Sequence, residues 1–474
     1  MQPLTLDEFK IHAQNSQYVS VFHEVSARNL TPIEIYACLC KAHNTQGVMI
    51  ENLNQKENER FSFICFDPIA SLSIYKDDGQ NPLNAIRDFQ STYATSTRKE
   101  MAELMTNSVG FFTYDSVRYF EELPDRHAIN SAFPAILFQC HQLNVTFDHK
   151  KQTILISVLV KTGEKSAVIY QQAQEKIKKI INLLLSGYKV SQPQNRNTDA
   201  TVEADIADSD FIRMVEKAKN YIACGDAFQI VLSRCFKRHY SVSPLEIYKT
   251  LREVSPAPFM FYFPTESSVI IGASPERFMR VHHNEITVNP IAGTRKRTMG
   301  KTDSMISDDL LNDKKEIAEH MMLVDLARND VGVVSDPGSV QVRELLKVKH
   351  YSHVSHITST VTGQLQKKYD ALDAFFAAFP AGTLSGAPKI RAMQIIDELE
   401  TSRRGLYGGA ICRFDSVQNF ESCIAIRMAI LKDGVATIRT GAGIVYDSNP
   451  ENEAEETYQK ARSLLDAIAK AHGE

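Results

Sequence analysis

Short hydrophobic runs alternate with polar residues along the first third of the chain, in the pattern that half-buried β-strands produce. YVSVFHEV (18–25) and RFSFICF (60–66) both have this period of two. Between them, a Thr-Pro pair precedes IEIYACLCKA (33–42), which predicts a capped helix. Segments 108–121 and 134–160 continue the strand pattern with one short helix. The first 160 residues are therefore predicted to be rich in strands.

The hydrophobic pattern is interrupted between two helical segments. A helix predicted over 165–185 is followed by the polar stretch SGYKVSQPQNRNTDA (186–200). This stretch shows neither the hydrophobic period of a strand nor that of a helix, and it is the best linker candidate. A second helix begins at Asp208 and ends at Gly225, because glycine commonly stops helices. We therefore predict three parts, namely an N-terminal region (1–160), a helix and linker (161–207), and a larger C-terminal region (208–470).

The first of two hairpins in the C-terminal region is ERFMRVHHNEITVNPI (276–291). Its central His-Asn pair predicts a two-residue turn, and that register sets Glu276 opposite Ile291. The hairpin therefore presents a carboxylate beside the sequence PIAGT (290–294) at its open end.

The second hairpin is CIAIRMAILKDGVATIRTGAG (423–443), and its Asp-Gly pair is a strong signal for a two-residue turn. The same register argument sets Arg427 opposite Thr440. This hairpin therefore presents a guanidinium beside the turn Gly441-Ala442-Gly443.

Two carboxylates lie in the first turns of a helical pattern, KKEIAEHMMLVDLARNDV (314–331). Glu316 and Glu319 share one face, and like charges at this spacing cost a helix roughly 0.2–0.5 kcal/mol. A divalent cation bound between oxygen ligands would remove that repulsion. A solvated acidic face on an ordinary helix is the simpler interpretation of this segment alone. The apolar residues expected to anchor the helix in a core are Ile317, Met321, Leu323, Val324 and Leu326.

The last helix, within SNPENEAEETYQKARSLLDAIAKA (448–471), repeats the acidic pattern with Glu453 and Glu456. Ser448 and Glu451 at its start predict a capping box. Two acidic helix starts, an arginine strand and a glycine-rich turn suggest an anion held partly through magnesium.

The loop AGTLSGAP (381–388) has small residues before a proline and a helix. Such a loop could expose backbone N–H groups to a carboxylate or phosphate, although a tight helix-entry turn explains it equally well.

Composition excludes several classes of partner. The formal charge of −4 and pI near 6.4 provide no basic surface for nucleic acid or an anionic membrane. No apolar stretch reaches the ~18 residues that span a bilayer, and the start lacks a signal-peptide pattern, so we expect a cytoplasmic protein. The eight cysteines contain no C-x-x-C pair, which favours reduced thiols over disulfides or zinc.

Several segments, in order and spacing, resemble the chorismate-utilising enzymes, and specifically anthranilate synthase component I. The resemblance is dense from about 208 to 465 and thinner in GFFTYDSVRYFE (110–121) and GVMIENLNQKENERFSFICFDP (47–68). It implies an α+β fold in which two antiparallel β-sheets pack face to face with helices on the outside. The segments that carry it are PIAGTRKR (290–297), KEIAEHMMLVDLARNDVG (315–332), AGTLSGAPKIRAM (381–393), YGGAICRFD (407–415), CIAIR (423–427), GAGIVYDSNP (441–450) and EETYQKARSLL (455–465).

The resemblance implies a set of roles for the acidic and polar residues. Glu319 and Glu456 would bind Mg²⁺ together with the ring carboxylate of chorismate, and Glu316 and Glu453 would lie beside the metal. Glu276 would be the general acid that assists loss of the ring hydroxyl.

The remaining implied site residues contact the substrate. The carboxylate of the enolpyruvyl side chain would be held by Tyr407, Arg427 and the backbone of Gly441, Ala442 and Gly443. The substrate would also contact Gly293, Thr294 and Thr383, and His356 would be placed for the later proton transfer, although a structural histidine is an equal alternative.

Within the family, the residues at two positions distinguish which reaction is catalysed. Relatives that add water to chorismate carry a lysine base where this chain has Gln229, and an amide cannot take a proton from water. Relatives that make aminodeoxychorismate typically carry a nucleophilic lysine where this chain has Ala292. The resemblance therefore implies conversion of chorismate and ammonia to anthranilate and pyruvate. The alternatives are aminodeoxychorismate synthase component I, 2-amino-2-deoxyisochorismate synthase and a silent chorismate-binding subunit.

The resemblance also implies a glutamine amidotransferase partner (component II) and a tryptophan site. Relatives bind tryptophan between an L-L-E-S segment and an N-P-x-P-[YF]-M segment. Asn52 stands here where the family has serine, and Ser255 where it has asparagine. We therefore expect weak or altered tryptophan feedback, unless the two exchanges compensate. The residues that would line this site are Asn52, Pro258, Phe259 and Met260.

Overall fold

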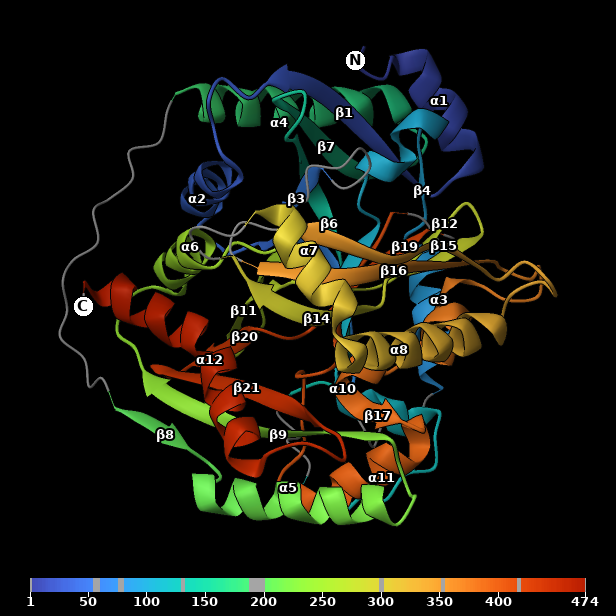
Figure 1. The fold of residues 1–474 in the computed structure, drawn as a ribbon. Helices are drawn as coiled ribbons and strands as arrows, with labels where there is room; N and C mark the ends of the chain where they lie inside the picture. The colour runs from blue at the N-terminus through green and yellow to red at the C-terminus, as the bar shows by residue number, and fades with distance from the viewer. Residues whose placement is uncertain are drawn as a thin grey trace.

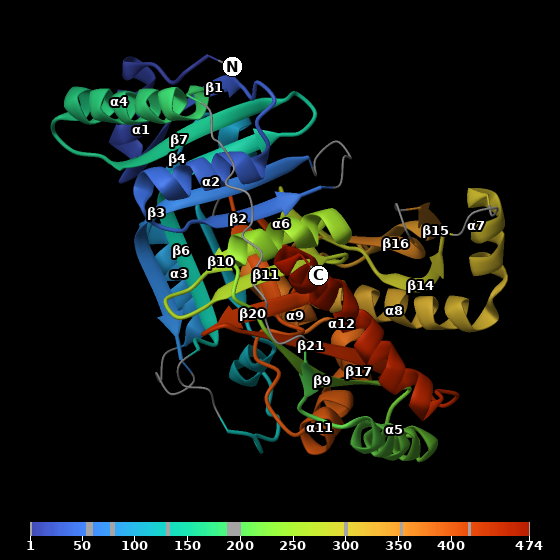
Figure 2. The same ribbon diagram turned by 90° about the vertical axis from the view of Figure 1, so that its left-hand side faces the viewer.

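The computed structural model describes residues 2–53, 60–75, 81–128, 133–186, 201–297, 302–350, 354–415 and 419–473. In these ranges, hydrogen bonds join the strands into one network with two arms that share strand β6 (Figures 1 and 2). Every described pairing is antiparallel except the two-residue pairing of β1 with β4. Apart from Ser186, the predicted linker lies outside the described residues.

The first arm runs from the N-terminal strands into the C-terminal ones. β2 makes the crossing, because Asn52 of β2 pairs with Phe259 of β10. In order of pairing the arm contains β4 (Thr95–Ser96), β1 (Tyr18–Ser26), β7 (Thr153–Lys161), β6 (Ile136–Asp148), β3 (Phe61–Ile74), β2 (Val48–Asn52), β10 (Phe259–Pro264), β11 (Val269–Ser274), β20 (Met428–Lys432), β21 (Val435–Ile444) and β9 (Gln229–His239), with β8 (Val202–Ala204) and β17 (Gly386–Ala387) also paired to β9.

The second arm leaves the opposite end of β6. It crosses between the regions where Phe111 of β5 pairs with Ile411 of β18. In order of pairing it contains β5 (Ser108–Phe112), β18 (Ala410–Phe414), β19 (Phe420–Ile424), β12 (Arg277–His282), β13 (Glu285–Val288) and β16 (Val354–Gln364), with β14 (Ile291–Lys296) and β15 (Gln341–His350) also paired to β16.

An apolar layer lies between the two arms. Phe111 of β5 meets Phe263 of β10 edge to face, with ring centroids 5.6 Å apart. The buried residues of this layer come from strands of both arms, including Val48, Val109, Phe261, Ile270, Ile411, Cys423 and Met428. The predicted α+β fold with two facing antiparallel sheets is therefore confirmed, and β6 belongs to both sheets.

Helices cover the outer faces of the arms. α4 lies on β1 and β7, α8 on β14 and β16, α11 on β9, and α12 across β21 (Figures 1 and 2). None of the helices in the described ranges is long and apolar enough to cross a membrane. The helices are α1 (Leu6–Asn15), α2 (Pro32–His43), α3 (Pro82–Thr92), α4 (Ser166–Leu185), α5 (Asp208–Ala223), α6 (Pro244–Val254), α7 (Asp303–Asn312), α8 (Lys314–Gly332), α9 (Ala371–Ala378), α10 (Gly382–Ser385), α11 (Lys389–Leu399), α12 (Pro450–His472) and the 3₁₀ helices η1 (Lys99–Leu104) and η2 (Tyr114–Tyr119).

Both predicted hairpins have the expected two-residue turns. His282 pairs with Glu285 and Lys432 pairs with Val435, and the turn residues between them have positive φ angles. The hairpin ladders end before the open ends, so the two predicted charged residues stand one position before β12 and β20. The side chains of Glu276 and Arg427 therefore lie outside the two strands, and both face the same cavity.

The two acidic helices begin at short polar caps. Asp313 caps α8 by accepting two backbone N–H hydrogen bonds, at 3.0 and 3.2 Å. α12 is capped by Asn449 at 2.9 Å, so the predicted capping box at Ser448 is wrong. The Ser448 hydroxyl accepts instead from the backbone N–H of Val445 at 3.1 Å.

The buried face of α8 lies further along the helix than predicted. Its first turns border a cavity rather than the core, which leaves three of the expected anchors only half-buried, namely Ile317, Met321 and Leu326. The fully buried residues are His320, Leu323, Val324, Ala327 and Val331.

Candidate active site

A cavity of about 510 Å³ lies where the open ends of both hairpins meet the starts of α8 and α12. We call it the central cavity, and its size suits a small ligand. Most of the predicted site residues line it, and they come from segments scattered between residues 229 and 456. These residues are Gln229, Glu276, Gly293, Glu316, Glu319, His356, Thr383, Tyr407, Arg427, Gly441, Gly443, Glu453 and Glu456.

One predicted residue is placed differently. Ala442 is buried, and its side chain belongs to the core cluster of Ile230 and Leu232, because alternate residues of β21 face opposite sides. Only its backbone could take part in binding. Thr294 lies in β14 opposite His356.

Four carboxylates gather at the central cavity from two helix starts, Glu316 and Glu319 on α8 and Glu453 and Glu456 on α12. Burial, together with the charges of Glu316 and Glu456, raises the pKa of Glu319 above its ordinary value. Burial and the charge of Glu456 likewise raise the pKa of Glu453. The two helices therefore bring negative charge together at a partly buried site, in which Glu456 is the most exposed of the four.

This donor set fits a hard divalent cation, since Mg²⁺ prefers carboxylate oxygens and a cation would relieve their repulsion. Glu316 is already held by Arg295, at 2.8 Å, and Glu456 by Lys460, at 2.6 Å, which leaves Glu319 and Glu453 less compensated. Within the described ranges, no three of these carboxylates bring ligand oxygens within 4.8 Å of one another. A bound ion would therefore also need oxygens from water or a ligand.

Lys460 lies among the carboxylates and was not predicted. Its ammonium is 2.6 Å from a carboxylate oxygen of Glu456 and donates a hydrogen bond to the carbonyl oxygen of Gly441, at 2.9 Å. The signal was present in the sequence, because Lys460 follows Glu456 by four residues and so shares its helix face. Other cavity residues that the sequence did not reveal are Val231, Pro275, Lys315, Leu384, Ile426 and Val445.

Glu276 occupies the cavity as a neutral acid. Burial raises its pKa to about 8, and the Thr383 hydroxyl donates a hydrogen bond to its carboxyl group at 3.2 Å. A carboxyl group with this pKa carries a proton near neutral pH, so it can donate that proton to a leaving group.

His356 faces the cavity from β16. Its Nδ1 donates to the carbonyl oxygen of Gly293 at 2.9 Å, and burial lowers the pKa of the ring. The ring is therefore neutral and carries its hydrogen on Nδ1. Gly293 has a φ of +66° at a β-bulge, and a Cβ there would come 3.1 Å from a carboxylate oxygen of Glu316. Glycine thus lets the strand bend toward the cavity.

Arg427 provides positive charge at the cavity. Burial lowers the pKa of its guanidinium, and within the described residues no carboxylate lies within 4.0 Å of it. Its printed hydrogen bond goes to the carbonyl oxygen of Lys460, at 3.4 Å. A half-buried cation without a counter-ion is a binding site for an anion, because leaving it unpaired is costly.

Tyr407 and the glycines of β21 lie beside Arg427. Burial raises the pKa of Tyr407 to about 12, so its hydroxyl remains a hydrogen-bond donor. A Cβ on Gly441 would come 2.7 Å from that hydroxyl, and a Cβ on Gly443 would come 2.7 Å from the amide nitrogen of Gln229. The glycines therefore keep this wall of the cavity open.

Gln229 contacts the acidic side of the cavity. Its amide nitrogen donates to Glu319 at 3.5 Å, and its amide oxygen is buried without a hydrogen-bond partner in the described structure. An amide carries no titratable proton at this position.

The loop over 381–388 is the tight helix entry and not an open anion cradle. It forms the short helix α10, and Gly386 and Ala387 then pair with β9. Gly386 has a φ of +132°, and a Cβ there would come 2.1 Å from the carbonyl oxygen of Gln229. The backbone is thus occupied by the sheet, and the loop contributes Thr383 through its side chain.

The residues predicted for tryptophan binding lie outside the central cavity, at the ladder between β2 and β10. Asn52 pairs with Phe259, and the carbonyl oxygen of Pro258 accepts from the backbone N–H of Leu53 at 2.9 Å. Met260 is fully buried in another core cluster. The two segments that the family uses for tryptophan are therefore adjacent.

The space beside Asn52 is small. It measures about 20 Å³, which holds about one water molecule, and we call it the seam pocket. The Arg413 guanidinium stacks on Phe63 at 3.9 Å and donates to the carbonyl oxygen of Met105 at 3.1 Å. The pocket is lined by Asn52, Phe61, Phe63, Glu103, Arg280, Val281, His282, Arg413, Asp415, Asn419, Phe420 and Glu421.

Comparisons with known proteins agree with this geometry. The family model of chorismate binding enzymes matches residues 48–466. Anthranilate synthase component 1 of Acetivibrio thermocellus is 38% identical and covers 98% of this chain and 98% of its own length. The protein of the same name from Aquifex aeolicus is 35% identical over 98% of this chain and 97% of its own.

Solved structures give the same result for the fold. The crystal structure of anthranilate synthase component I from Streptococcus pneumoniae TIGR4 has a TM-score of 0.72 and 33% identity, covering 93% of this chain and 99% of that one. The menaquinone-specific isochorismate synthase of Escherichia coli also has a TM-score of 0.72, but its 18% identity, over 97% of this chain and 98% of that one, shows the fold alone. The predicted resemblance is confirmed: the chain belongs to the chorismate-binding enzymes, and within them to the family of anthranilate synthase component 1.

Proposed function

We propose that this chain is the aminase subunit of an anthranilate synthase and converts chorismate and ammonia to anthranilate and pyruvate, the first step of tryptophan synthesis. One observation carries this proposal above the others. Glu276, with its pKa raised to about 8, places a protonated carboxyl group in a cavity that also holds the unpaired Arg427. Loss of a ring hydroxyl from a dianionic substrate needs both an acid and anion sites.

Glu276 and His356 would each take part in one of the two proton transfers. Ammonia attacks the ring carbon next to the carboxylate, and the ring hydroxyl takes the proton of Glu276 and leaves as water. The aminated intermediate then loses pyruvate and a ring proton, which restores the aromatic ring. His356 is neutral and lines the same cavity, so it can assist this later proton transfer.

The two carboxylates of chorismate would bind at different walls. Arg427 and the Tyr407 hydroxyl, with the backbone of Gly441 and Gly443, are suited to the enolpyruvyl carboxylate. Glu319 and Glu456 would hold Mg²⁺, with Glu316 and Glu453 beside it. When bound, the ion would supply positive charge to the ring carboxylate.

Two residues support anthranilate formation over addition of water and over aminodeoxychorismate formation. Gln229 offers an amide where a base is needed to activate water, and Ala292 offers no amine for a covalent intermediate. Mass analysis of the product distinguishes anthranilate from aminodeoxychorismate and 2-amino-2-deoxyisochorismate.

Ammonia from glutamine would come from a separate amidotransferase subunit. Burial raises the pKa of seven thiols, which makes them poor nucleophiles at neutral pH. The eighth, Cys224, is exposed at the C-cap of α5 and lies in no nucleophile elbow between a strand and a helix N-terminus. None of the eight cysteines therefore has the setting of a glutaminase nucleophile.

Tryptophan feedback would be weak. A tryptophan side chain buries about 150–250 Å² on binding, and the seam pocket, which Arg413 helps to line, holds only about 20 Å³. Binding would therefore require lining side chains such as Arg413 to move.

The test is turnover by the purified chain with chorismate, an ammonium salt and Mg²⁺, followed by anthranilate fluorescence and pyruvate release. We expect both products in equal amounts with ammonium and none with glutamine alone. Absence of pyruvate would contradict the lyase reaction, and glutaminase activity of the purified chain would contradict the need for a partner.

A further inference from the structure

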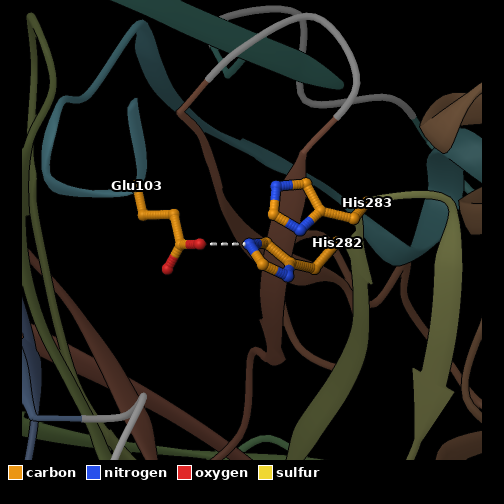
Figure 3. A group of neighbouring side chains, drawn as sticks. All are labelled: Glu103, His282 and His283. Atoms are coloured by element: carbon orange, nitrogen blue, oxygen red, sulfur yellow. Dashed lines mark hydrogen bonds and ion pairs between the residues drawn. The ribbon is translucent and has the colours of Figure 1, made fainter. Parts of the chain in front are cut away.

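A second group of ligating side chains lies away from the central cavity, at the border of the seam pocket (Figure 3). It contains Glu103 from η1 and the consecutive residues His282 and His283 from the β12–β13 hairpin. Their ligand atoms all lie within 4.8 Å of one another. Figure 3 shows the Glu103 carboxylate and both imidazole rings turned toward a common point.

The geometry is close to that of a three-ligand metal site. His282 Nε2 lies 2.7 Å from a Glu103 carboxylate oxygen, and the two imidazole rings are 4.0 Å apart between centroids. Ligands at ~2.1 Å from a tetrahedral ion are about 3.4 Å apart, so modest side-chain rotations would bring the three atoms to that spacing.

The hairpin holds the second histidine in place. His283 has a φ of +50° in the turn, and its backbone N–H donates to the Asn419 side chain at 3.0 Å. Its ring is therefore directed by the backbone, which is anchored independently of any metal.

The neighbouring charges do not oppose a cation strongly. Three arginines, Arg277, Arg413 and Arg280, lower the pKa of Glu421, so their charges are partly offset by this carboxylate. Asp415 adds a further acidic group to the pocket lining. The pocket itself has room for about one water molecule, which could complete the coordination of an ion.

We propose that Glu103, His282 and His283 bind a divalent transition-metal ion of the zinc class, at a site separate from the carboxylates of the central cavity. Two imidazoles and one carboxylate are a ligand set that Zn²⁺ uses with water in the fourth position. Mg²⁺ is excluded from this role because it prefers oxygen ligands. The proposal does not depend on the proposed reaction.

The ion would connect two parts of the chain that are far apart in sequence. η1 belongs to the N-terminal region, whereas the β12–β13 hairpin carries Glu276 just before its first strand. A metal bound at the turn would therefore fasten the far end of the hairpin that positions the catalytic acid.

The test is a zinc titration of the full chain after removal of bound metal, in millimolar Mg²⁺ so that the central carboxylates are occupied. We expect one equivalent of Zn²⁺ to bind and to raise the melting temperature, because a ligand that binds only the folded state stabilises it. Co²⁺ in the same site should give the visible absorption of a nitrogen- and oxygen-bound ion.

The variants Glu103→Gln and His283→Asn should each weaken Zn²⁺ binding by about tenfold or more. His283→Asn keeps the turn, since asparagine tolerates a positive φ, so a folding defect cannot explain the loss. His239→Asn, at an exposed histidine on β9, is the matched control and should bind as the original chain does. Unchanged binding in both site variants, or loss of the equivalent in Glu319→Gln, would overturn the proposal. Absence of Zn²⁺ binding in the original chain would show that His282 and Glu103 form an ordinary ion pair.

Discussion

The central cavity and the seam pocket differ in how their walls are made. Among the described residues, the cavity of about 510 Å³ is lined by residues from 229 onward, whereas the seam pocket of about 20 Å³ takes residues from both regions. Small residues such as Gly293, Gly441 and Gly443 keep the cavity open, while large side chains such as Arg413, stacked on Phe63, line the seam pocket. The volume of each site thus follows from a few side chains on the same scaffold.

The two sites also differ in how their charges are compensated. In the central cavity, Arg427 has no carboxylate within 4.0 Å in the described structure, and burial together with neighbouring carboxylates raises the pKa of Glu319 and Glu453. In the seam pocket, Glu421 lies against arginines, and His282 is bonded to Glu103. Uncompensated charge in a buried site costs stability, so its retention in the central cavity indicates a ligand, whereas the charges at the seam pocket are paired even without one.

Of the substitutions that test the difference between the two sites, Glu276→Gln should have the largest effect on the rate. Removal of a general acid costs roughly 10²- to 10⁴-fold in rate, so anthranilate formation with ammonium should fall by that factor. Glu285→Gln, at the turn end of the same hairpin, is the control and should keep its activity, since Glu285 pairs with Arg343 on the surface. Near-normal turnover of Glu276→Gln would show that Glu276 is not the general acid.

The raised pKa of Glu276 should make both the rate and the stability of the folded state depend on pH. The acid is active while protonated, so the rate should fall as pH rises through about 8. The folded state also favours the protonated form, so this group's contribution to stability is present below the ordinary pKa of 4.5 and is lost as pH rises through about 8. Melting curves of Glu276→Gln should accordingly depend less on pH over that range than those of the original chain.

Substitution of a proposed metal ligand should have the next largest effect. A catalytic metal ion supplies several kcal/mol of charge stabilisation, and about 1.4 kcal/mol is tenfold, so Glu456→Gln should lose about 10²-fold at limiting Mg²⁺. Glu455→Gln, on the exposed side of the same helix, is the control. The measurement is initial rate against Mg²⁺ concentration, and full activity of Glu456→Gln at limiting Mg²⁺ would refute the assignment.

A smaller loss is expected for Arg427→Lys. The ammonium keeps the charge but cannot form the paired hydrogen bonds of a guanidinium, and hydrogen bonds to charged groups contribute about 1.5–3 kcal/mol. That is roughly 10- to 100-fold in the binding of chorismate. Arg462→Lys, exposed on α12, is the matched control. Unchanged kinetic constants would mean that Arg427 is structural.

Much of the fold and the site could be predicted because the signals are local. The turns at 283–284 and 433–434 depend on residues that accept a positive φ, and α8 depends on the periodicity of its own sequence. The central cavity then follows, because the registers and helix starts place their charged residues at one place. The family resemblance added the roles, which the geometry alone would have left open.

The missed features depend on contacts between distant segments or on neglected periodicity. Arg413 reaches Phe63 and Met105 from another region, which no local pattern indicates. The inward side of Ala442 could have been predicted from strand alternation, and Lys460 from helical spacing. The sharing of β6 between the sheets depends on two pairing partners along one strand edge, which sequence periodicity does not distinguish.

The smallest expected effect concerns tryptophan at the seam pocket. In the original chain, inhibition by tryptophan should be weak because the pocket that Asn52 and Arg413 line together measures only about 20 Å³. Arg413→Ala removes that side chain and should strengthen inhibition by about tenfold, a change of ~1.4 kcal/mol. The chain contains no tryptophan, so binding can be followed by the fluorescence of the ligand itself.

The matched control is Arg343→Ala, which removes an exposed arginine outside both sites. Equal melting temperatures of the two variants would exclude a general loosening of the fold. If the original chain is already inhibited at micromolar tryptophan, and Asn52→Ala abolishes that inhibition, then Arg413 moves aside readily and the exchanges at Asn52 and Ser255 compensate. In that case the contrast between an open catalytic site and a closed regulatory one would be wrong. If Arg413→Ala instead gains inhibition that the control lacks, one arginine is enough to separate the two sites.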